Sequence, residues 1–181
     1  MAESRIVSVF GSAQPKPETP RYEEAYRVGE LLAEHGHTVM TGGYAGTMEA
    51  TSKGAKEAGG HVIGVTVGQI ERKFGTKKNP YVDEVIHYDT LYDRLHHLVA
   101  KCSAAIALPG GIGTLSEVAL TWSMIQIDEI ERMPFILLGA RWHDAITRYY
   151  GDGEFIRAEY LHLLNFAQSP EEAVTMLDAW K

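Results

Sequence analysis

The segment from residue 104 to residue 126 constrains the fold most. An apolar run over 104–108 leads into a glycine-rich turn over 109–113. Apolar residues then recur at helical spacing, at Leu115, Val118, Ala119, Trp122 and Ile125. This order predicts a strand, a turn and a helix. The glycines leave backbone open to a ligand, and the amides of the turn and of the helix N-terminus favour an anion, most simply a phosphate.

Glu117 follows this turn, and we expect it in the first turn of the helix. A carboxylate is not needed there to bind a phosphate, which suggests a role in chemistry. A structural explanation is also available, because an acidic residue near a helix N-terminus interacts favourably with the helix dipole. The Gly-x-Gly pattern is a weak motif when taken alone.

Two earlier strands also run into glycine turns. Ile6–Phe10 is followed by Gly11 and Ser12, and the strand over 38–40 runs into a glycine turn over 41–49 that opens a helix. A third strand is expected over 61–67. This β-α-β-α-β pattern with short connections predicts an α/β fold with a doubly wound, mostly parallel sheet flanked by helices, formed by residues 1–181 as a single domain.

The other expected elements complete that sheet and its layers of helices. Helices are expected over 22–35, 47–58, 91–101, 142–150 and from 170 onward, and strands over 84–88, 104–108, 135–138 and 163–167. Leu91, Leu95, Leu98 and Val99 are expected to point inward, with Arg94 beside this stripe. The basic segment 68–81 is interpreted as a solvated loop, with a mobile flap over a ligand as the alternative.

In a parallel sheet the three glycine turns lie at the same edge, where ligands bind in open α/β folds. None of them is a P-loop, and the first strand lacks the Gly-x-Gly-x-x-Gly pattern of dinucleotide-binding proteins. An ordinary surface loop is the alternative for the turn at Gly11. No lysine lies in any of the three turns.

Composition limits the class of protein. With 181 residues, 45% of them apolar and 23% charged, the chain suits one soluble domain with a sizeable core. A formal net charge of −7 argues against a nucleic-acid partner. The single cysteine, Cys102, excludes an internal disulfide and is interpreted as a buried, inert thiol. No signal peptide, membrane segment or metal-binding motif is recognised, so we expect a cytoplasmic protein with neither a membrane partner nor a metal.

Residues 109–117, Pro-Gly-Gly-Ile-Gly-Thr-Leu-Ser-Glu, resemble the PGGxGTxxE signature of the LOG ("lonely guy") family of cytokinin-activating proteins. The resemblance covers nearly the whole chain. It includes the segments 10–12, 20–22, 41–49, 59–65 and 121–126. It implies a Rossmann-like fold and a homodimer or a larger homo-oligomer.

The resemblance also implies an activity, the hydrolysis of the N-glycosidic bond of a nucleoside 5′-monophosphate. The products are a free base and ribose 5-phosphate, and cytokinin riboside monophosphates are candidate substrates. Arg94 and Glu117 are the implied catalytic pair, and no cofactor is expected. The residues expected to bind the phosphate or the rest of the substrate are Gly11, Ser12, Gly42, Gly43, Gly46, Thr47, Met48, Gly110, Gly111, Ile112, Gly113 and Thr114. A lysine decarboxylase label also attaches to this family, but that chemistry needs a Schiff-base lysine, which the turns lack.

One segment departs from the family pattern. The arginine motif, roughly Met-His-x-Arg-Lys in the family, is Leu91-Tyr92-Asp93-Arg94-Leu95 in this chain. The arginine is kept, whereas the Met, the His and the Lys are replaced. Some relatives of the fold carry a phosphorylated pterin, molybdenum cofactor, without cleaving it. A non-catalytic carrier or sensor of a phosphorylated nucleotide or pterin is therefore the alternative function, and a purely structural assembly protein is a third.

Overall fold

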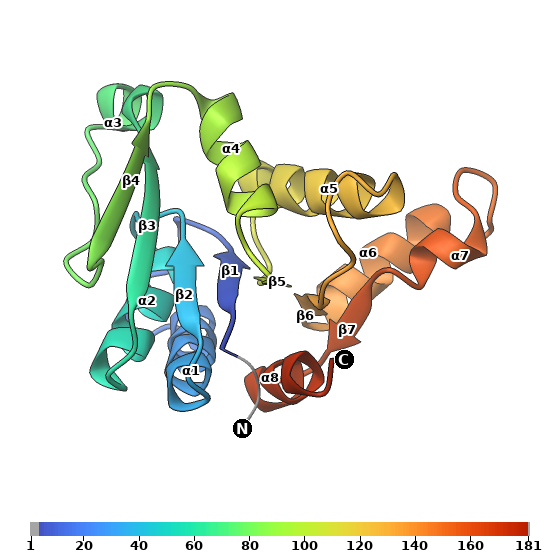
Figure 1. Cartoon of the computed structure of the whole chain (residues 1–181), viewed down its shortest axis with the longest axis horizontal. Helices are drawn as coiled ribbons and strands as arrows, with labels where there is room; N and C mark the ends of the chain where they lie inside the picture. Colours follow the sequence, from blue (N-terminus) through green and yellow to red (C-terminus); the bar gives the residue numbers. More distant parts are fainter. Residues whose placement is uncertain (1–3, 181) are drawn as a thin grey trace.

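A computed structural model describes residues 4–180. Seven strands form one sheet in the order β4-β3-β2-β1-β5-β6-β7, and every neighbouring pair is parallel (Figure 1). The strands are β1 (Ile6–Phe10), β2 (Thr38–Thr41), β3 (Val62–Val67), β4 (Glu84–Tyr88), β5 (Ala104–Ala107), β6 (Phe135–Leu138) and β7 (Asn165–Ala167). The predicted Rossmann-like α/β class is confirmed, with a sheet that is parallel throughout.

Helices alternate with the strands along the chain. They are α1 (Pro20–Glu34), α2 (Thr47–Glu57), α3 (Gly68–Phe74), α4 (Leu91–Ala100), α5 (Ile112–Gln126), α6 (Ala140–Tyr150), α7 (Ala158–Leu161) and α8 (Pro170–Asp178). Within residues 4–180, no helix combines the length and the apolar content that crossing a bilayer requires.

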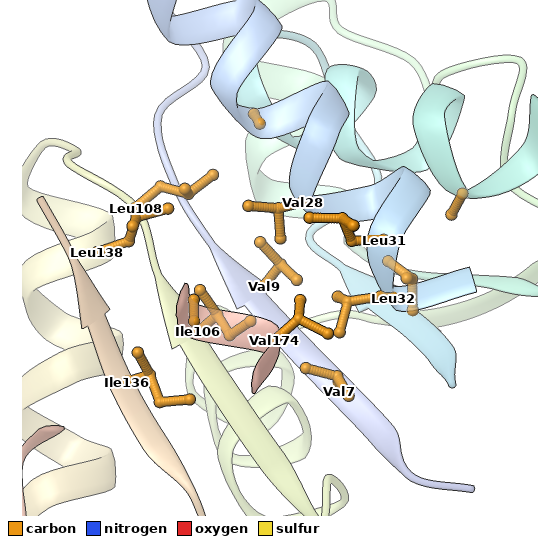
Figure 2. Packing of buried hydrophobic residues seen from close by; sticks show 14 of the residues in the cluster. Val7, Val9, Val28, Leu31, Leu32, Ile106, Leu108, Ile136, Leu138 and Val174 are labelled. Carbon is orange, nitrogen blue, oxygen red and sulfur yellow. The ribbon is translucent and has the colours of Figure 1, made fainter. Parts of the chain in front are cut away.

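The two faces of the sheet support two separate cores, because successive strand residues point to opposite faces. Val7 and Val9 of β1 pack with α1 and α8, and Figure 2 shows them beside Val28 of α1 and Val174 of α8. Phe10 belongs to the other core, with residues of α4, α5 and α6. Both faces of β1 are therefore covered by helices, as its continuous apolar sequence requires.

The strand order reverses between β1 and β5. From β1 the chain adds β2, β3 and β4 on one side, and it later adds β5, β6 and β7 on the other. The amide of Leu108 donates to the carbonyl of Phe10 at 2.9 Å, which holds the two carboxyl ends together. The chain leaves the carboxyl ends of β1 and β5 toward opposite faces of the sheet, so a crevice forms between these two strand ends. The first turn and the central glycine turn flank this crevice.

Segment 68–81 is not entirely a loop as expected, because its first half forms α3. Gly68 occupies the first helical position, where its flexibility does little harm. Gly75 has φ of 63°, the left-handed conformation that commonly ends a helix. The two glycines therefore bracket a short helix. The four-residue helix α7 was also not expected.

Two glycines allow α1 and α2 to pack closely. A Cβ atom at Gly29 of α1 would collide with the carbonyl oxygen of Thr51, and one at Gly54 of α2 would collide with that of Tyr26. The hydroxyl of Thr51 donates to the carbonyl of Ala25 at 3.1 Å across the same interface. Both obstacles are backbone atoms, so an added methyl group has to push the helices apart.

We expect Gly29→Ala and Gly54→Ala each to lower the free energy of unfolding by about 1–3 kcal/mol, the usual cost of overpacking. Gly113→Ala is the matched control, because a Cβ atom at that helical glycine would meet no atom within 4 Å. The control should unfold at the same urea concentration as the wild type, or slightly higher. Equal stability of all three variants would contradict the close approach of α1 and α2.

Candidate functional site

Arg94 lies in the first turn of α4 and points into the protein. The hydroxyl of Thr90 caps this helix by accepting from the amide of Asp93 at 3.2 Å. Only 6% of Arg94 is exposed. Its Nε donates to the carbonyl of Val65 at 2.8 Å, and its Nη2 donates to the carbonyl of Gly42 at 3.3 Å. Two nitrogens of the guanidinium are thereby fixed to the ends of β2 and β3.

This placement corrects the expected orientation of α4. Arg94 was expected beside the inward stripe, and Leu91 was expected within it, yet Leu91 is 49% exposed. The two backbone carbonyls explain the difference, because they satisfy a buried guanidinium that would otherwise be costly. An apolar periodicity contains no information about such acceptors.

Gly42 and Tyr44 also contact the guanidinium of Arg94. A Cβ atom at Gly42 would collide with Nη2 of Arg94, so only glycine allows this approach. The guanidinium carbon lies 5.7 Å from the centre of the Tyr44 ring, a cation–π distance. The Tyr44 hydroxyl donates to the carbonyl of Val67 at 3.1 Å and accepts from its amide at 2.7 Å. The aromatic ring is therefore itself fixed to β3.

Glu117 faces Arg94 from the second turn of α5, not from the first turn as expected, because the helix begins at Ile112. Its Oε1 lies 4.0 Å from Nη1 of Arg94, and only 7% of Glu117 is exposed. Burial raises the pKa of Glu117 to about 7, although the charge of Arg94 opposes the shift. Burial also lowers the pKa of Arg94. The two groups attract each other across a gap longer than a hydrogen bond.

The N-terminus of α5 is open to solvent. Gly111 is its N-cap, and neither Gly111 nor Gly113 has an atom within 4 Å of a Cβ position. Ile112 between them is 80% exposed. The first amides of a helix have no partner within the helix, so this end offers several donors.

Thr114 is buried directly behind this open end. Its hydroxyl oxygen has no hydrogen-bond partner in the part of the chain that the structure describes. A Cβ atom at Gly110 would collide with that oxygen, so the turn needs glycine at this position. An unpartnered buried hydroxyl is uncommon and is a typical sign of a functional position.

The first and second glycine turns are joined at Ser12. Its carbonyl accepts from the Thr47 amide at 2.8 Å and from the Thr47 hydroxyl at 3.1 Å. Gly46 has φ of 75°, and a Cβ atom there would collide with the same carbonyl. A Cβ atom at Gly11 would collide with the Thr47 hydroxyl. These four residues therefore hold two loops together at the edge of the sheet.

Sequence reasoning did not identify Asn79, which supports the second turn. Asn79 is buried, its amide donates to the carbonyl of Gly43 at 2.8 Å, and its side chain donates to the carbonyl of Tyr44 at 3.1 Å. It lies in the segment interpreted as a solvated loop, where no periodicity marks it. The tyrosine under Arg94 was likewise not foreseen.

The predicted site residues fall into two adjoining groups. One group surrounds Arg94. A Cβ atom at Gly42 would come within 4 Å of both Arg94 and the sulfur of Met48, and Arg94 in turn faces Glu117. Ser12 and Gly110 line a cavity of about 640 Å³, which Arg94 and Glu117 do not line. Among residues 4–180, no group of three or more His, Cys, Asp or Glu side chains lies close enough to hold a metal ion.

Comparison with known proteins places this chain in a family. The sequence profile of the SLOG cluster4 family matches residues 4–137. The chain belongs to this family. It is 40% identical to an uncharacterized protein of Archaeoglobus fulgidus over 114 residues, which are 63% of this chain and 71% of that protein.

Two more distant relatives have names that state a function. The chain is 29% identical over 184 aligned positions to the cytokinin riboside 5′-monophosphate phosphoribohydrolase LOG5 of Arabidopsis thaliana, covering 98% of this chain and 78% of that protein. The solved structure of a molybdenum cofactor binding protein from Rippkaea orientalis superposes with a TM-score of 0.75 at 28% identity, covering 96% of this chain and 95% of that one. Distant homology to both groups is thus confirmed, as the sequence motif predicted.

The raised pKa of Glu117 predicts how stability depends on pH. The ordinary pKa of 4.5 rises to about 7 in the folded protein, so the folded state holds this proton more tightly than the unfolded state. The contribution of Glu117 to stability therefore falls as pH rises from about 4.5 to about 7 and is constant above that range.

We expect the free energy of unfolding of the wild type, minus that of Glu117→Gln, to fall by roughly 3 kcal/mol between pH 4 and pH 8. Urea denaturation at several pH values measures this difference, and other titrating groups cancel because both proteins share them. A difference that does not change with pH would contradict the assigned shift.

Proposed function

We propose that this protein is a nucleoside 5′-monophosphate phosphoribohydrolase, which releases a free base and ribose 5-phosphate. The observation that carries the proposal is the buried pair of Arg94 and Glu117, held 4.0 Å apart beside an open helix N-terminus. The relationship to LOG5 supports the same reaction. Cytokinin riboside monophosphates are one substrate class within this proposal.

The phosphate binds to the amides at the N-terminus of α5, from Gly111 to Thr114. These donors and the helix dipole attract an anion although the protein carries a net charge of −7. Thr114 and Glu117 are three residues apart, a rise of about 4.5 Å along the helix. A ribose 5-phosphate anchored at this end therefore extends toward the carboxylate.

Glu117 acts on the ribose when the bond between C1′ and the base breaks. The bonding electrons leave with the base, and positive charge develops on the sugar ring. The Glu117 carboxylate stabilises that charge and orients a water molecule for attack at C1′. The water supplies the hydroxyl group of ribose 5-phosphate and the proton that the departing base takes up.

The charge of Arg94 opposes the rise in the pKa of Glu117 and so increases the ionised fraction of this carboxylate. Its Nε and Nη2 donate to backbone carbonyls, so Nη1 faces Glu117 and the ligand. Because the pKa of Glu117 is about 7 without a ligand, the nearby positive charge matters for the ionised fraction at neutral pH.

Incubating the protein with a panel of nucleoside 5′-monophosphates tests the activity, with released base measured by chromatography. We expect turnover by the wild type, and a loss of about 10²–10⁴-fold in kcat for Glu117→Gln, the range for removal of a general acid or base. Arg94→Gln should show a loss of the same order. The rate of the wild type should rise with pH through about 7, as Glu117 ionises.

Ser116→Ala is the matched control, because Ser116 neighbours Glu117 but is exposed, and its hydroxyl donates to the carbonyl of Ile112 within the helix. It should retain the wild-type rate. Turnover of no nucleotide by the wild type, or equal rates for the wild type and Glu117→Gln, would contradict the proposal.

A carrier or sensor of a phosphorylated nucleotide or pterin is the second candidate function. It is favoured by the similarity to the molybdenum cofactor binding protein and by the replaced residues around Arg94. Tight binding of a nucleoside monophosphate without release of base, unaffected by Glu117→Gln, would favour the carrier over the enzyme.

We also propose that two copies associate through the exposed face of α5. Glu117 is the only charged residue of this helix and is buried, so its outer face carries no charge. That face exposes Ile112 and Leu115, with Ala119 and Ser123 farther along the helix. An uncharged helix face of this kind fits a symmetric interface in which each copy covers the other.

Sedimentation velocity should show a dimer for the wild type and a monomer for Leu115→Glu, because the change places two charges in the shared interface. Leu91→Glu is the matched control, because Leu91 is also apolar and exposed but lies on α4, outside the proposed interface. A monomeric wild type at micromolar concentration, or a dimeric Leu115→Glu variant, would contradict this assignment.

A further inference from the structure

The cavity of about 640 Å³ lies on the opposite side of the central glycine turn from Arg94. Arg94 bonds to the ends of β2 and β3, whereas the cavity is bounded by α6, which follows β6 on the other side of β1 and β5. The turn after β1 also lines the cavity, through Ser12 and Gln14. Gly110 of the central turn lines it directly, next to the open amides of α5. The cavity therefore reaches Gly110, the residue that precedes the proposed phosphate subsite in the sequence.

Two arginines line this cavity, and none of its lining residues is acidic. Arg141 of α6 makes no ion pair and no side-chain hydrogen bond within residues 4–180. Arg21 of α1 is paired with Glu24 at 2.8 Å, so its charge is partly compensated. A guanidinium without a partner beside a cavity, in a protein of net charge −7, is suited to an anionic ligand.

Further hydrogen-bond donors line the same space. The hydroxyl of Ser12 accepts from the amide of Gln14 at 3.1 Å, which leaves its own hydrogen available. Trp142 is only 8% exposed, and its indole N–H has no acceptor in the part of the chain that the structure describes. An oxyanion in this cavity can accept from the Ser12 hydroxyl, whereas the indole nitrogen of Trp142 is itself buried.

We propose that this cavity is a second anion subsite, which takes the outer phosphate of a ligand that carries two linked phosphates. The inference rests on the proposed function in one respect, the binding of the first phosphate at the N-terminus of α5. Gly110 lies between the two positions, so a diphosphate spans from the α5 amides to Arg141. The ligand class is a nucleoside diphosphate or a related compound with a pyrophosphate group.

Pyrophosphate and orthophosphate test this subsite without any assumption about the base. We expect titration calorimetry at fixed ionic strength to give a Kd for pyrophosphate at least about tenfold lower than that for orthophosphate, the effect of one additional charge-assisted hydrogen bond. Arg141→Gln should remove most of this preference and leave the Kd for orthophosphate unchanged. The double variant Arg21→Gln/Arg141→Gln should abolish the preference.

Arg148→Gln is the matched control, because Arg148 lies on the exposed surface of α6 and does not line the cavity. It should keep the wild-type preference. A wild type that binds the two anions equally, or that fails to bind pyrophosphate, overturns the proposal, as does a preference that survives in the double variant. These outcomes are independent of catalysis, because failure to release a base from nucleoside monophosphates would reject the hydrolase and leave the comparison of the two anions intact.

Discussion

The burial of the Arg94 guanidinium is the interaction on which the rest of the site depends. A charged group in the interior is costly unless its donors are satisfied, and here two backbone carbonyls accept from it. Those carbonyls belong to different elements, the end of β3 and the turn after β2. The arginine therefore fixes the second glycine turn against the sheet and, from the same position, faces Glu117.

The glycines of the site have a steric role that follows from this arrangement. Gly42 gives room to the guanidinium, Gly46 gives room to the carbonyl of Ser12, and Gly110 gives room to the hydroxyl of Thr114. Gly111 and Gly113 differ, because nothing approaches them and their open surroundings leave the amides of α5 accessible. The signature thus combines glycines that allow close packing with glycines that allow ligand approach.

Much of the fold follows from the sequence, because buried parallel strands are continuous apolar runs and many of the helices have apolar residues at helical spacing. β1, β4 and β6 have the predicted bounds, and α8 begins at Pro170 as predicted. The orientation of Arg94 and the burial of Asn79 were not predictable in this way. Both are polar residues whose partners are backbone carbonyls distant in sequence, so no local pattern identifies them.

The same geometry bears on whether the replaced residues around Arg94 disturb its pairing with Glu117. Leu91 and Tyr92, which stand where the LOG motif has Met and His, are both exposed, whereas Arg94 alone of that turn is directed into the protein. The carbonyls that hold it come from β2 and β3, not from α4. Replacement of its exposed neighbours therefore changes the outer surface of α4, next to the uncharged face of α5. The distance between Arg94 and Glu117 is unaffected, because contacts with the sheet set the position of Arg94. The changes at Leu91 and Tyr92 thus alter the surface around this pair and leave the pair in place.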